Sequence, residues 1–230
     1  MTRPPEVPDR VAWSVGLLTG YLAGSVSFSR LVGERAAPGE DLDVTYIDVA
    51  ETGTTVEFHG ITPTSVKEHA GTRAMLLSIA MEATKAALPV MAARLLLPGT
   101  PAAPAAATGA VAGHVFPVWN RFRGGYGMSP MLGGLLVLDP VGLVATTAGL
   151  SALIGLTRDR RLMMLWPVTV PLWGAARHRE DLVAFGVVSN VVYWTRLVPE
   201  LRRGLRSVLA VRRPGATRLG RDEVAAAEQQ

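Results

Sequence analysis

Cysteine is absent from the 230-residue sequence, and charged residues are scarce. Without cysteine the chain has no disulfide bond, no thiol nucleophile and no cysteine-ligated metal. Charged residues make up 18% of the chain against 49% hydrophobic residues, and the mean hydropathy is +0.27. A soluble domain of this size carries more charge and less apolar surface. The composition therefore predicts an all-α integral membrane protein that crosses the bilayer several times.

Long apolar runs follow one another along the chain, and a spanning helix needs roughly 20 mostly apolar residues. We expect about seven spans, at 11–32, 75–97, 102–119, 128–138, 141–156, 162–176 and 182–193. The Asp139-Pro140 pair separates the fourth span from the fifth, because proline interrupts a helix and disfavours helical geometry at the residue before it. A six-span alternative has 128–156 as one kinked helix.

Lys and Arg are distributed unevenly between the loops, and this bias predicts orientation. With the N-terminus outside and the C-terminus inside, the inside loops hold Arg30, Arg35, Lys67, Arg73, Arg121, Arg123, Arg158, Arg160 and Arg161, followed by the Arg-rich tail. The isoelectric point near 9.9 follows from these residues. Attraction to anionic lipid headgroups is a sufficient role for these basic residues, so we expect no nucleic-acid partner.

A polar insertion, 33–71, lies in the first expected inside loop. Segments 44–49 and 55–58 are rich in β-branched and aromatic residues and flank a turn, so a small β-hairpin is expected there. Near the C-terminus, 201–209 is a basic amphipathic segment suited to the membrane interface or to a solvated helix end. We expect one membrane domain over 1–210, a disordered tail over 211–230, and a first span that is retained rather than cleaved.

Ionisable and hydroxylated residues at the membrane are candidates for function. Glu82 and Lys85 are three residues apart and can pair on one helix face, as a structural pair or a substrate site. His114 is near the end of the third expected span, where a packed histidine is the alternative. Ser25 belongs to a run of small hydroxylated residues, 24–30, which also suits helix packing.

A basic, glycine-rich turn follows the third expected span. It contains Arg121, Arg123, Gly124, Gly125 and Gly127. Anions are held by arginine side chains and by backbone amides that glycine leaves accessible. A plain inter-helix loop is the alternative. The four histidines are scattered and form no metal-ligand cluster, so no metal or other cofactor is expected.

Three of these segments, in this order, resemble the bacterial membrane glycerol-3-phosphate acyltransferase family that uses acyl phosphate, commonly called PlsY. The first is Gly24-Ser25-Val26-Ser27-Phe28, and the second runs from Glu82 through Lys85 to Leu88-Pro89-Val90. The third and most specific is Gly113-His114-Val115-Phe116-Pro117-Val118 followed by Phe122-Arg123-Gly124-Gly125-Tyr126-Gly127. The likeness extends from about residue 16 to residue 203.

The resemblance implies transfer of an acyl group from acyl phosphate to the 1-hydroxyl of glycerol 3-phosphate, giving lysophosphatidic acid and phosphate. It implies a multi-pass protein of the bacterial cytoplasmic membrane, with these two substrates and membrane lipids as partners; the oligomeric state is open, and a monomer is compatible with it. His114, Ser25 and Lys85 would be catalytic. Phosphate would be bound by Arg121, Arg123, Gly124, Gly125, Gly127, Thr64, Ser65 and Arg35.

The sequence also departs from the family pattern. The family's Asp-Ile-Arg segment and its glycine-rich Gly-Ser-Gly-Asn loop are replaced by the expected hairpin and by 60–66, where only Thr64 clearly matches. Arg35 and Lys67 are the nearest substitutes for the missing arginine, and Tyr126 replaces a lysine. The segment 177–181 resembles a family motif but falls on the expected outer side. Two alternatives follow: an acyltransferase with another acceptor, or a catalytically silent homologue that binds lipid or a partner.

Overall fold

The computed structural model describes residues 7–49 and 54–211. The elements in these residues are α1 (Asp9–Gly24), α2 (Phe28–Ala36), β1 (Val44–Val49), β2 (Thr54–His59), α3 (Pro63–Leu96), α4 (Ala102–Val115), the 3-10 helix η1 (Val118–Asn120), α5 (Met128–Leu138), α6 (Pro140–Thr157), the 3-10 helix η2 (Arg160–Leu165), α7 (Trp166–Ala176) and α8 (Glu180–Val211). Apart from Val211, the expected tail lies outside the described residues.

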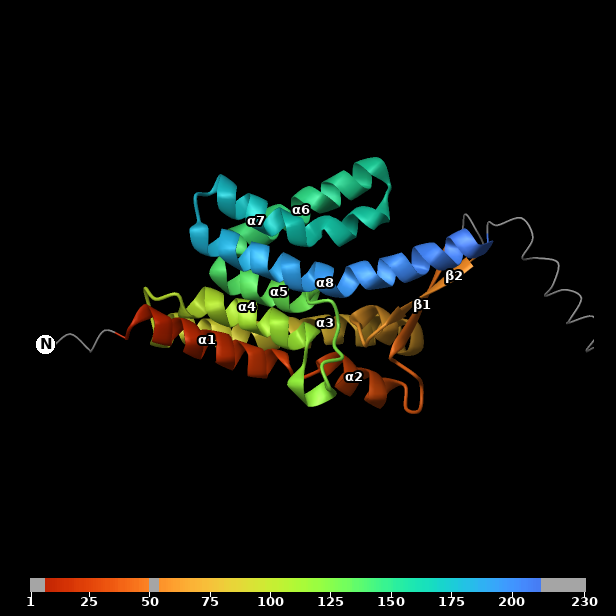
Figure 1. Ribbon diagram of the computed structural model, residues 1–230, viewed down its shortest axis with the longest axis horizontal. Helices are drawn as coiled ribbons and strands as arrows, with labels where there is room; N and C mark the ends of the chain where they lie inside the picture. Colours follow the sequence, from red (N-terminus) through yellow and green to blue (C-terminus); the bar gives the residue numbers. More distant parts are fainter. Residues whose placement is uncertain (1–6, 50–53, 212–230) are drawn as a thin grey trace, which may run out of the picture.

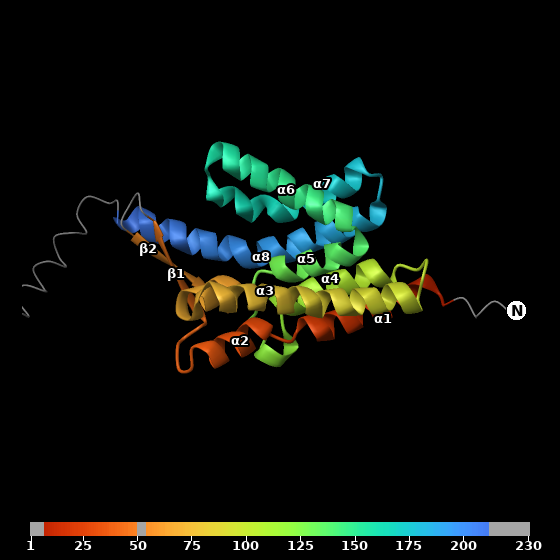
Figure 2. The ribbon, with the colours of Figure 1, turned by 180° about the vertical axis from the view of Figure 1, so that it is seen from behind.

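The helices lie side by side, with their axes roughly parallel to the long axis of the molecule (Figures 1 and 2). Helices α1, α3, α4 and α5 form one side of the molecule, and α6 and α7 lie on the other side of α8. A buried apolar core joins α1, α3, α4 and α5 to α6, α7 and α8, with Val90, Val111, Met131, Leu135 and Phe185 among its members. The predicted all-α architecture is therefore confirmed at this level.

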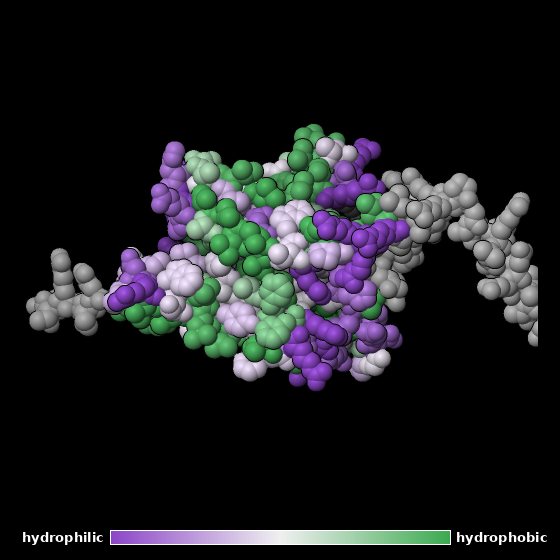
Figure 3. All heavy atoms as spheres, viewed as in Figure 1, coloured by the Kyte–Doolittle hydropathy of each residue, from purple (hydrophilic) through white to green (hydrophobic). Residues whose placement is uncertain are grey.

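Within residues 7–49 and 54–211, four helical segments are long and apolar enough to cross a membrane: Asp9–Ala36, Pro63–Leu96, Pro140–Thr157 and Glu180–Arg206. Large apolar side chains such as Leu88, Leu96 and Leu156 are exposed on them. In Figure 3, hydrophobic residues fill the middle of the visible face, whereas hydrophilic residues gather toward the two ends of the long axis. This distribution suits a molecule whose middle is surrounded by lipid.

Helix α1 packs on α4 through glycines at intervals of one helical turn. A Cβ added at Gly16, Gly20 or Gly24 would collide with the carbonyl of Ala102, Ala106 or Ala110, respectively. Gly109 and Gly113 of α4 lie equally close to the backbone of α1. Small residues of this kind allow membrane helices to approach closely. The contact places the end of α1 beside the end of α4, which carries His114.

The expected first span, 11–32, lies within the apolar segment Asp9–Ala36, but the helix is interrupted there, because α1 ends at Gly24 and α2 begins at Phe28. The hydroxyl of Ser27 caps α2 by accepting a hydrogen bond from the Arg30 amide, so the chain turns between the two helices. Residues 128–156 do not form the single kinked helix of the six-span alternative, because α5 ends at Leu138 and α6 begins at Pro140. Asp139 caps α6 through the Gly142 amide at 2.9 Å, with Pro140 as the first residue of α6.

Two other helices are longer than expected. Helix α3 begins at Pro63, after a reciprocal cap between Thr62 and Ser65, and is kinked at Gly71, where φ is 81°. Helix α8 joins the expected last span to the basic segment 201–209 in one helix that contains Pro199. Both helices therefore reach beyond their apolar parts into polar sequence.

Strands β1 and β2 pair antiparallel, from Val44 opposite His59 to Val49 opposite Thr54; the turn between them, 50–53, lies outside the described residues. The pair is held against α8, where Arg196 Nη2 donates to the His59 carbonyl at 3.1 Å. His59 Nδ1 also lies 3.7 Å from Glu200 Oε2. The segment after β2, which leads into α3, is thereby fixed between α8 and the rest of the bundle.

Candidate functional site

Three ionisable side chains meet in the interior of the bundle: Glu82 and Lys85 of α3, and His114 of α4. They are 0%, 5% and 6% exposed, respectively. Lys85 Nζ lies 2.5 Å from Glu82 Oε2, and His114 Nδ1 lies 3.0 Å from the same oxygen. Lys85 Nζ is also 3.2 Å from His114 Nδ1. A buried carboxylate thus has a cation and an imidazole as partners, as the cost of burying charge requires.

The break between α1 and α2 completes this cluster. Helix ends leave backbone carbonyls and amides without intrahelical partners. Lys85 Nζ donates to the Val26 carbonyl in the break, and the Ser29 amide in the first turn of α2 donates to Glu82 Oε1 at 2.8 Å. The Ser29 hydroxyl lies 3.1 Å from the same oxygen. The cluster therefore joins α2, α3 and α4, and both Glu82 oxygens are occupied.

These contacts orient the imidazole of His114. A carboxylate only accepts hydrogen bonds, so the contact with Glu82 places the ring proton on Nδ1 and leaves Nε2 as an acceptor. Nε2 faces the glycine-rich turn, because a Cβ added at Gly125 would come within 2.5 Å of it. Gly125 thus packs directly against this nitrogen, in a contact too close for any side chain. As an acceptor, Nε2 can take a proton from a hydroxyl group that reaches it.

The glycine-rich turn wraps around the end of α4. Gly124 packs against the His114 carbonyl, and a Cβ added at Gly125 would lie 3.3 Å from the Ile61 carbonyl, just before α3. Gly127 has a φ of 92° and precedes α5. The side chains of Arg121 and Arg123 are exposed. The turn therefore places glycine backbone and two exposed cations next to the buried cluster.

Ser25 attaches this turn to α1. Its buried hydroxyl donates to the Tyr21 carbonyl at 2.8 Å and accepts from the Val118 amide at 3.4 Å. Lys85 donates a hydrogen bond to the carbonyl of the adjacent residue, Val26. Ser25, Lys85 and His114, the three candidate catalytic residues, are therefore brought into one region.

The other candidate phosphate-binding residues are more dispersed. Ser65 is buried and its hydroxyl donates to the Thr62 carbonyl at 2.8 Å within the cap of α3, whereas Thr64 is exposed in the first turn of α3. Arg35 lies at the end of α2 and lines a groove together with Arg73. Arg35 is thus placed with a different group of residues from that around Lys85.

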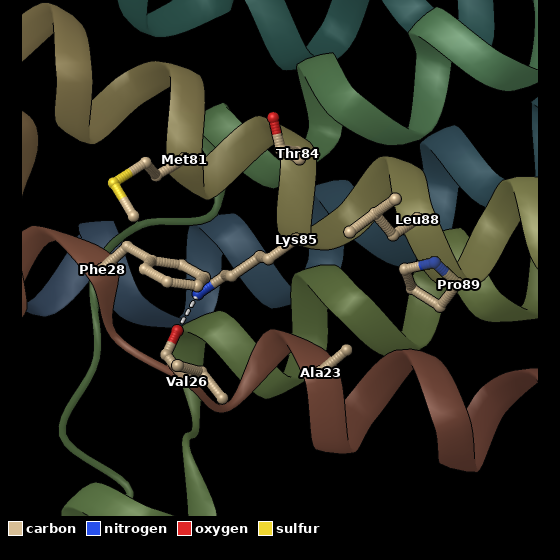
Figure 4. A pocket seen from close by; sticks show the side chains of 8 residues that line it. All are labelled: Ala23, Val26, Phe28, Met81, Thr84, Lys85, Leu88 and Pro89. Atoms are coloured by element: carbon tan, nitrogen blue, oxygen red, sulfur yellow. Dashed lines mark hydrogen bonds between the residues drawn. The ribbon is translucent and has the colours of Figure 1, made fainter.

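An apolar groove of about 320 Å³ opens beside the cluster (Figure 4). Ala23, Val26 and Phe28 line one side of it, and Met81, Thr84, Lys85, Leu88 and Pro89 of α3 line the other. Lys85 crosses the groove with its aliphatic stem and directs its ammonium group at Val26 (Figure 4). The groove is suited to a hydrocarbon chain that ends near polar groups.

Tyr126 has a different environment from the other residues of the turn. Its hydroxyl is buried and has no hydrogen-bond partner in the part of the chain that the structure describes. Burial raises the pKa of the Tyr126 phenol, and the nearby Glu200 carboxylate raises it further, whereas Arg196 and Arg203 act in the opposite direction. Glu200 is itself buried and accepts a hydrogen bond from Arg203 at 2.5 Å. Tyr126 thus lies among charged residues of α8.

Sequence reasoning misses three parts of this site. It predicts the pairing of Glu82 with Lys85, as a structural pair or a substrate site, from an acidic residue three positions before a lysine in an apolar run, but not the contact of Glu82 with His114. Ser29 and the Val26 carbonyl have no such signal, since their roles depend on a helix break that the apolar run hides. Glu200 and Arg196 are also missed, because their approach to Tyr126 is a tertiary contact.

Comparison with known proteins places these features in a family. A family model described as glycerol-3-phosphate acyltransferase matches residues 14–207. The glycerol-3-phosphate acyltransferase of Anaeromyxobacter sp. (strain K) is 37% identical over 143 residues, which cover 60% of this chain and 65% of the relative. The chain therefore spans just under two thirds of that relative's length. The enzyme of Methylorubrum extorquens (strain PA1) is 32% identical over 190 residues, covering 81% of this chain and 86% of the relative.

A solved structure shares the fold. The glycerol 3-phosphate form of PlsY, an integral membrane glycerol 3-phosphate acyltransferase, matches with a TM-score of 0.66 at 17% identity, over 85% of this chain and 92% of that chain. Its lysophosphatidic acid form matches with a TM-score of 0.62 at 16% identity. Because the family model covers most of its length, the chain belongs to the membrane-bound glycerol-3-phosphate acyltransferase family.

Proposed function

We propose that this protein transfers a fatty acyl group from acyl phosphate to the 1-hydroxyl of glycerol 3-phosphate. The observation that carries the proposal is the buried Glu82–Lys85–His114 cluster, whose imidazole Nε2 faces the glycine-rich turn beside an apolar groove. The hydroxyl oxygen attacks the acyl carbon, the bond from this carbon to the phosphate oxygen breaks, and lysophosphatidic acid and inorganic phosphate leave. The reaction needs no redox cofactor.

His114 Nε2 accepts the proton of the attacking hydroxyl, and Glu82 holds the ring in the required tautomer through Nδ1. Phosphate can also accept this proton, so positioning contributes alongside base catalysis. Lys85 keeps a positive charge at the inner end of the site, and the acyl chain lies in the groove that its stem crosses.

The glycine-rich turn neutralises phosphate charge in this proposal. Arg121 and Arg123 supply cations, and the backbone amides of Gly124, Gly125 and Gly127 supply donors. Ser25 positions the turn through the Val118 amide. Thr64 and Ser65, at the start of α3, follow the Ile61 carbonyl that Gly125 approaches, so they are assigned to the same polar region.

We further propose seven spans, with the N-terminus outside, the C-terminus inside and the β1–β2 pair on the cytoplasmic side of a bacterial cytoplasmic membrane. Helices α4, α5 and α7 have 14, 11 and 11 residues, fewer than the roughly 20 of an average span. Their apolar sequences and their packing within the common core support membrane positions for them. The loop arginines support the orientation.

Reconstitution in lipid vesicles with acyl phosphate and glycerol 3-phosphate tests the reaction. The wild-type chain should form lysophosphatidic acid, and His114→Ala should lower the rate about 100-fold or more. Gly125→Ala should also inactivate the enzyme, because its methyl group would collide with Nε2 and displace the imidazole. Gly149→Ala, where an added Cβ meets no neighbour within 4 Å, is the matched control. A His114→Ala variant with the wild-type rate would refute the mechanism.

A second candidate is transfer to another hydroxyl acceptor, and Tyr126 favours it. A phenol near the Glu200 carboxylate stands where the family has a lysine. A panel of hydroxyl acceptors with labelled acyl donor separates the two candidates, since exclusive use of glycerol 3-phosphate would eliminate the second. Turnover that Lys85→Ala abolishes would exclude the catalytically silent alternative.

A further inference from the structure

Helix α8 reaches the segment between β2 and α3 through Arg196, a residue to which the proposed reaction assigns no role. Its Nη2 donates to the His59 carbonyl at 3.1 Å. The amide of the next residue, Gly60, donates to the Asp43 carbonyl, just before β1, at 2.7 Å. Figures 1 and 2 show β2 beside the far part of α8. The peptide bond between residues 59 and 60 is therefore held by α8 on one side and by the strand pair on the other.

Gly60 lies between Arg196 and the glycine-rich turn. A Cβ added at Gly60 would be 3.2 Å from Arg196 Nη2 and 2.7 Å from the Gly124 carbonyl oxygen. The φ of Gly60 is 118°, a value that favours glycine. The next carbonyl oxygen, that of Ile61, would be 3.3 Å from a Cβ added at Gly125. The segment after β2 thus packs, backbone against backbone, on two consecutive glycines of the turn.

The same two glycines pack against His114. A Cβ added at Gly124 would collide with the His114 carbonyl, and one added at Gly125 would come within 2.5 Å of Nε2. Contacts of this density transmit displacements, since a packed interior has little free volume. A series of direct contacts therefore runs from Arg196 on α8, through the segment after β2 and the turn, to the nitrogen that takes the proton in the proposed reaction.

Arg196 also lies near the turn itself, beside Tyr126. Burial and then the Glu200 carboxylate raise the pKa of the Tyr126 phenol, whereas the Arg196 cation acts to lower it. An effect of this kind requires the guanidinium to lie close to the phenol. One half-buried side chain is thus close both to the segment after β2 and to the turn on which this segment packs.

We propose that Arg196 is a positioning residue for acyl transfer. By holding the His59 carbonyl it fixes the segment after β2 against the glycine-rich turn, and the turn against His114 Nε2. Arg196 itself touches no reacting group. Its effect on the rate rests on the proposed function, because a misplacement of about 1 Å at the reacting groups costs up to about 100-fold. Its effect on the position of the turn does not depend on the reaction.

Steady-state kinetics in lipid vesicles, expressed per folded molecule, test the effect on the rate. Arg196→Ala should lower kcat about tenfold or more. It should leave KM for acyl phosphate within about twofold, because Arg196 does not line the apolar groove. Arg196→Lys should recover part of kcat, since an ammonium group can donate to the same carbonyl. Arg202→Ala, which removes an exposed arginine of the same helix, should keep the wild-type kcat. An unchanged kcat in Arg196→Ala would overturn the proposal, even with a raised KM for glycerol 3-phosphate.

Limited proteolysis tests the position of the turn without any reaction. Trypsin cleaves after arginine, and three exposed arginines serve: Arg121 and Arg123 in the turn, and Arg177 between α7 and α8. In the purified full chain in detergent, Arg196→Ala should raise cleavage in the turn relative to cleavage after Arg177 about fivefold or more, since local opening controls such cleavage. Arg202→Ala should keep the wild-type ratio.

Gly60→Ala serves if Arg196→Ala does not fold. Its methyl group would collide with the Gly124 carbonyl, so it should raise cleavage in the turn while Arg196 is kept. If the wild-type chain forms no lysophosphatidic acid, the proposed function is wrong, and the cleavage ratio alone decides the present proposal. A wild-type ratio in Arg196→Ala, or in Gly60→Ala where that variant replaces it, would show that α8 does not position the turn.

Discussion

Glu82 is the residue on which the most elements converge. Its two oxygens receive donors from α2, α3 and α4, through Ser29, Lys85 and His114. Since the side chain is fully buried, none of these hydrogen bonds is replaced by water if the carboxylate is lost. The same residue therefore supports both the stability of the bundle and the orientation of the imidazole.

Replacing Glu82 with Gln should reduce stability and activity together. The change leaves the Lys85 ammonium buried without its counter-charge, which costs about 3–5 kcal/mol. It also turns one of the two acceptor oxygens into an NH2 donor, so the hydrogen bonds with Ser29 and with His114 Nδ1 cannot both be kept. Thermal unfolding in detergent and the acyl-transfer rate measure the two effects. Glu34→Gln, which breaks an exposed pair, should change stability by less than about 1 kcal/mol. Equal melting temperatures for the two variants would show that the cluster is not structural.

Tyr126 predicts a loss of stability in alkaline solution. The pKa of this phenol is raised in the folded chain above its ordinary value of 10.0, so above about pH 10 the unfolded state releases the proton first. Fewer protons on the unfolded state mean that stability falls as pH rises, by up to about 1.4 kcal/mol per pH unit. Tyr126→Phe should melt with a weaker pH dependence between pH 9 and 11. An unchanged slope would contradict this assignment.

At the scale of elements, the α1–α4 contact decides where the site residues lie. Its three α1 glycines occur at every fourth position, so they form one stripe that faces α4. The backbone-to-backbone approach leaves no space for a side chain. Ser25 and His114 both follow this contact in their helices, so a wider spacing between α1 and α4 would displace both residues.

Gly20→Ala should therefore destabilise the protein, whereas Gly149→Ala should not. The new methyl group at position 20 would collide with the Ala106 carbonyl, and at position 149 it meets open space. Overpacking of this kind costs about 1–3 kcal/mol, while alanine in an open helix position gains about 0.5–1 kcal/mol over glycine. Melting temperatures of the two variants check this. A Gly20→Ala variant as stable as wild type would argue against the close approach of α1 to α4.

Short sequence motifs single out Ser25, Lys85, His114 and the glycine-rich turn as candidates, and the structure brings these residues into one region. Their catalytic and binding roles stay predictions. The break between α1 and α2 could not be predicted from the apolar run 11–32. Hydropathy is averaged over a long window, so it does not show where one helix ends and the next begins. The meeting of Glu82 with His114, and of Tyr126 with Glu200, depends on helix packing and has no local signature.

At the scale of the whole molecule, the separation of apolar middle and charged ends allows a direct test of orientation. The chain has no cysteine, so a single introduced cysteine is the only thiol in it that a maleimide can label. Glu40→Cys, before β1, should react with a membrane-impermeant maleimide only after permeabilisation of the cell. Pro98→Cys, between α3 and α4, should react in intact cells. The reverse pattern would show that the proposed orientation is inverted.

The contact between the β1–β2 pair and α8 affects the order in which the molecule is completed. The strands are synthesised early, but His59 acquires Arg196 and Glu200 as neighbours only after the last helix has been made. Chains fold from the N-terminus during synthesis. The polar segment from Gly60 to Thr62, which borders the glycine-rich turn, therefore gains its final support at the end of biogenesis, and the nascent protein has an incomplete site until then.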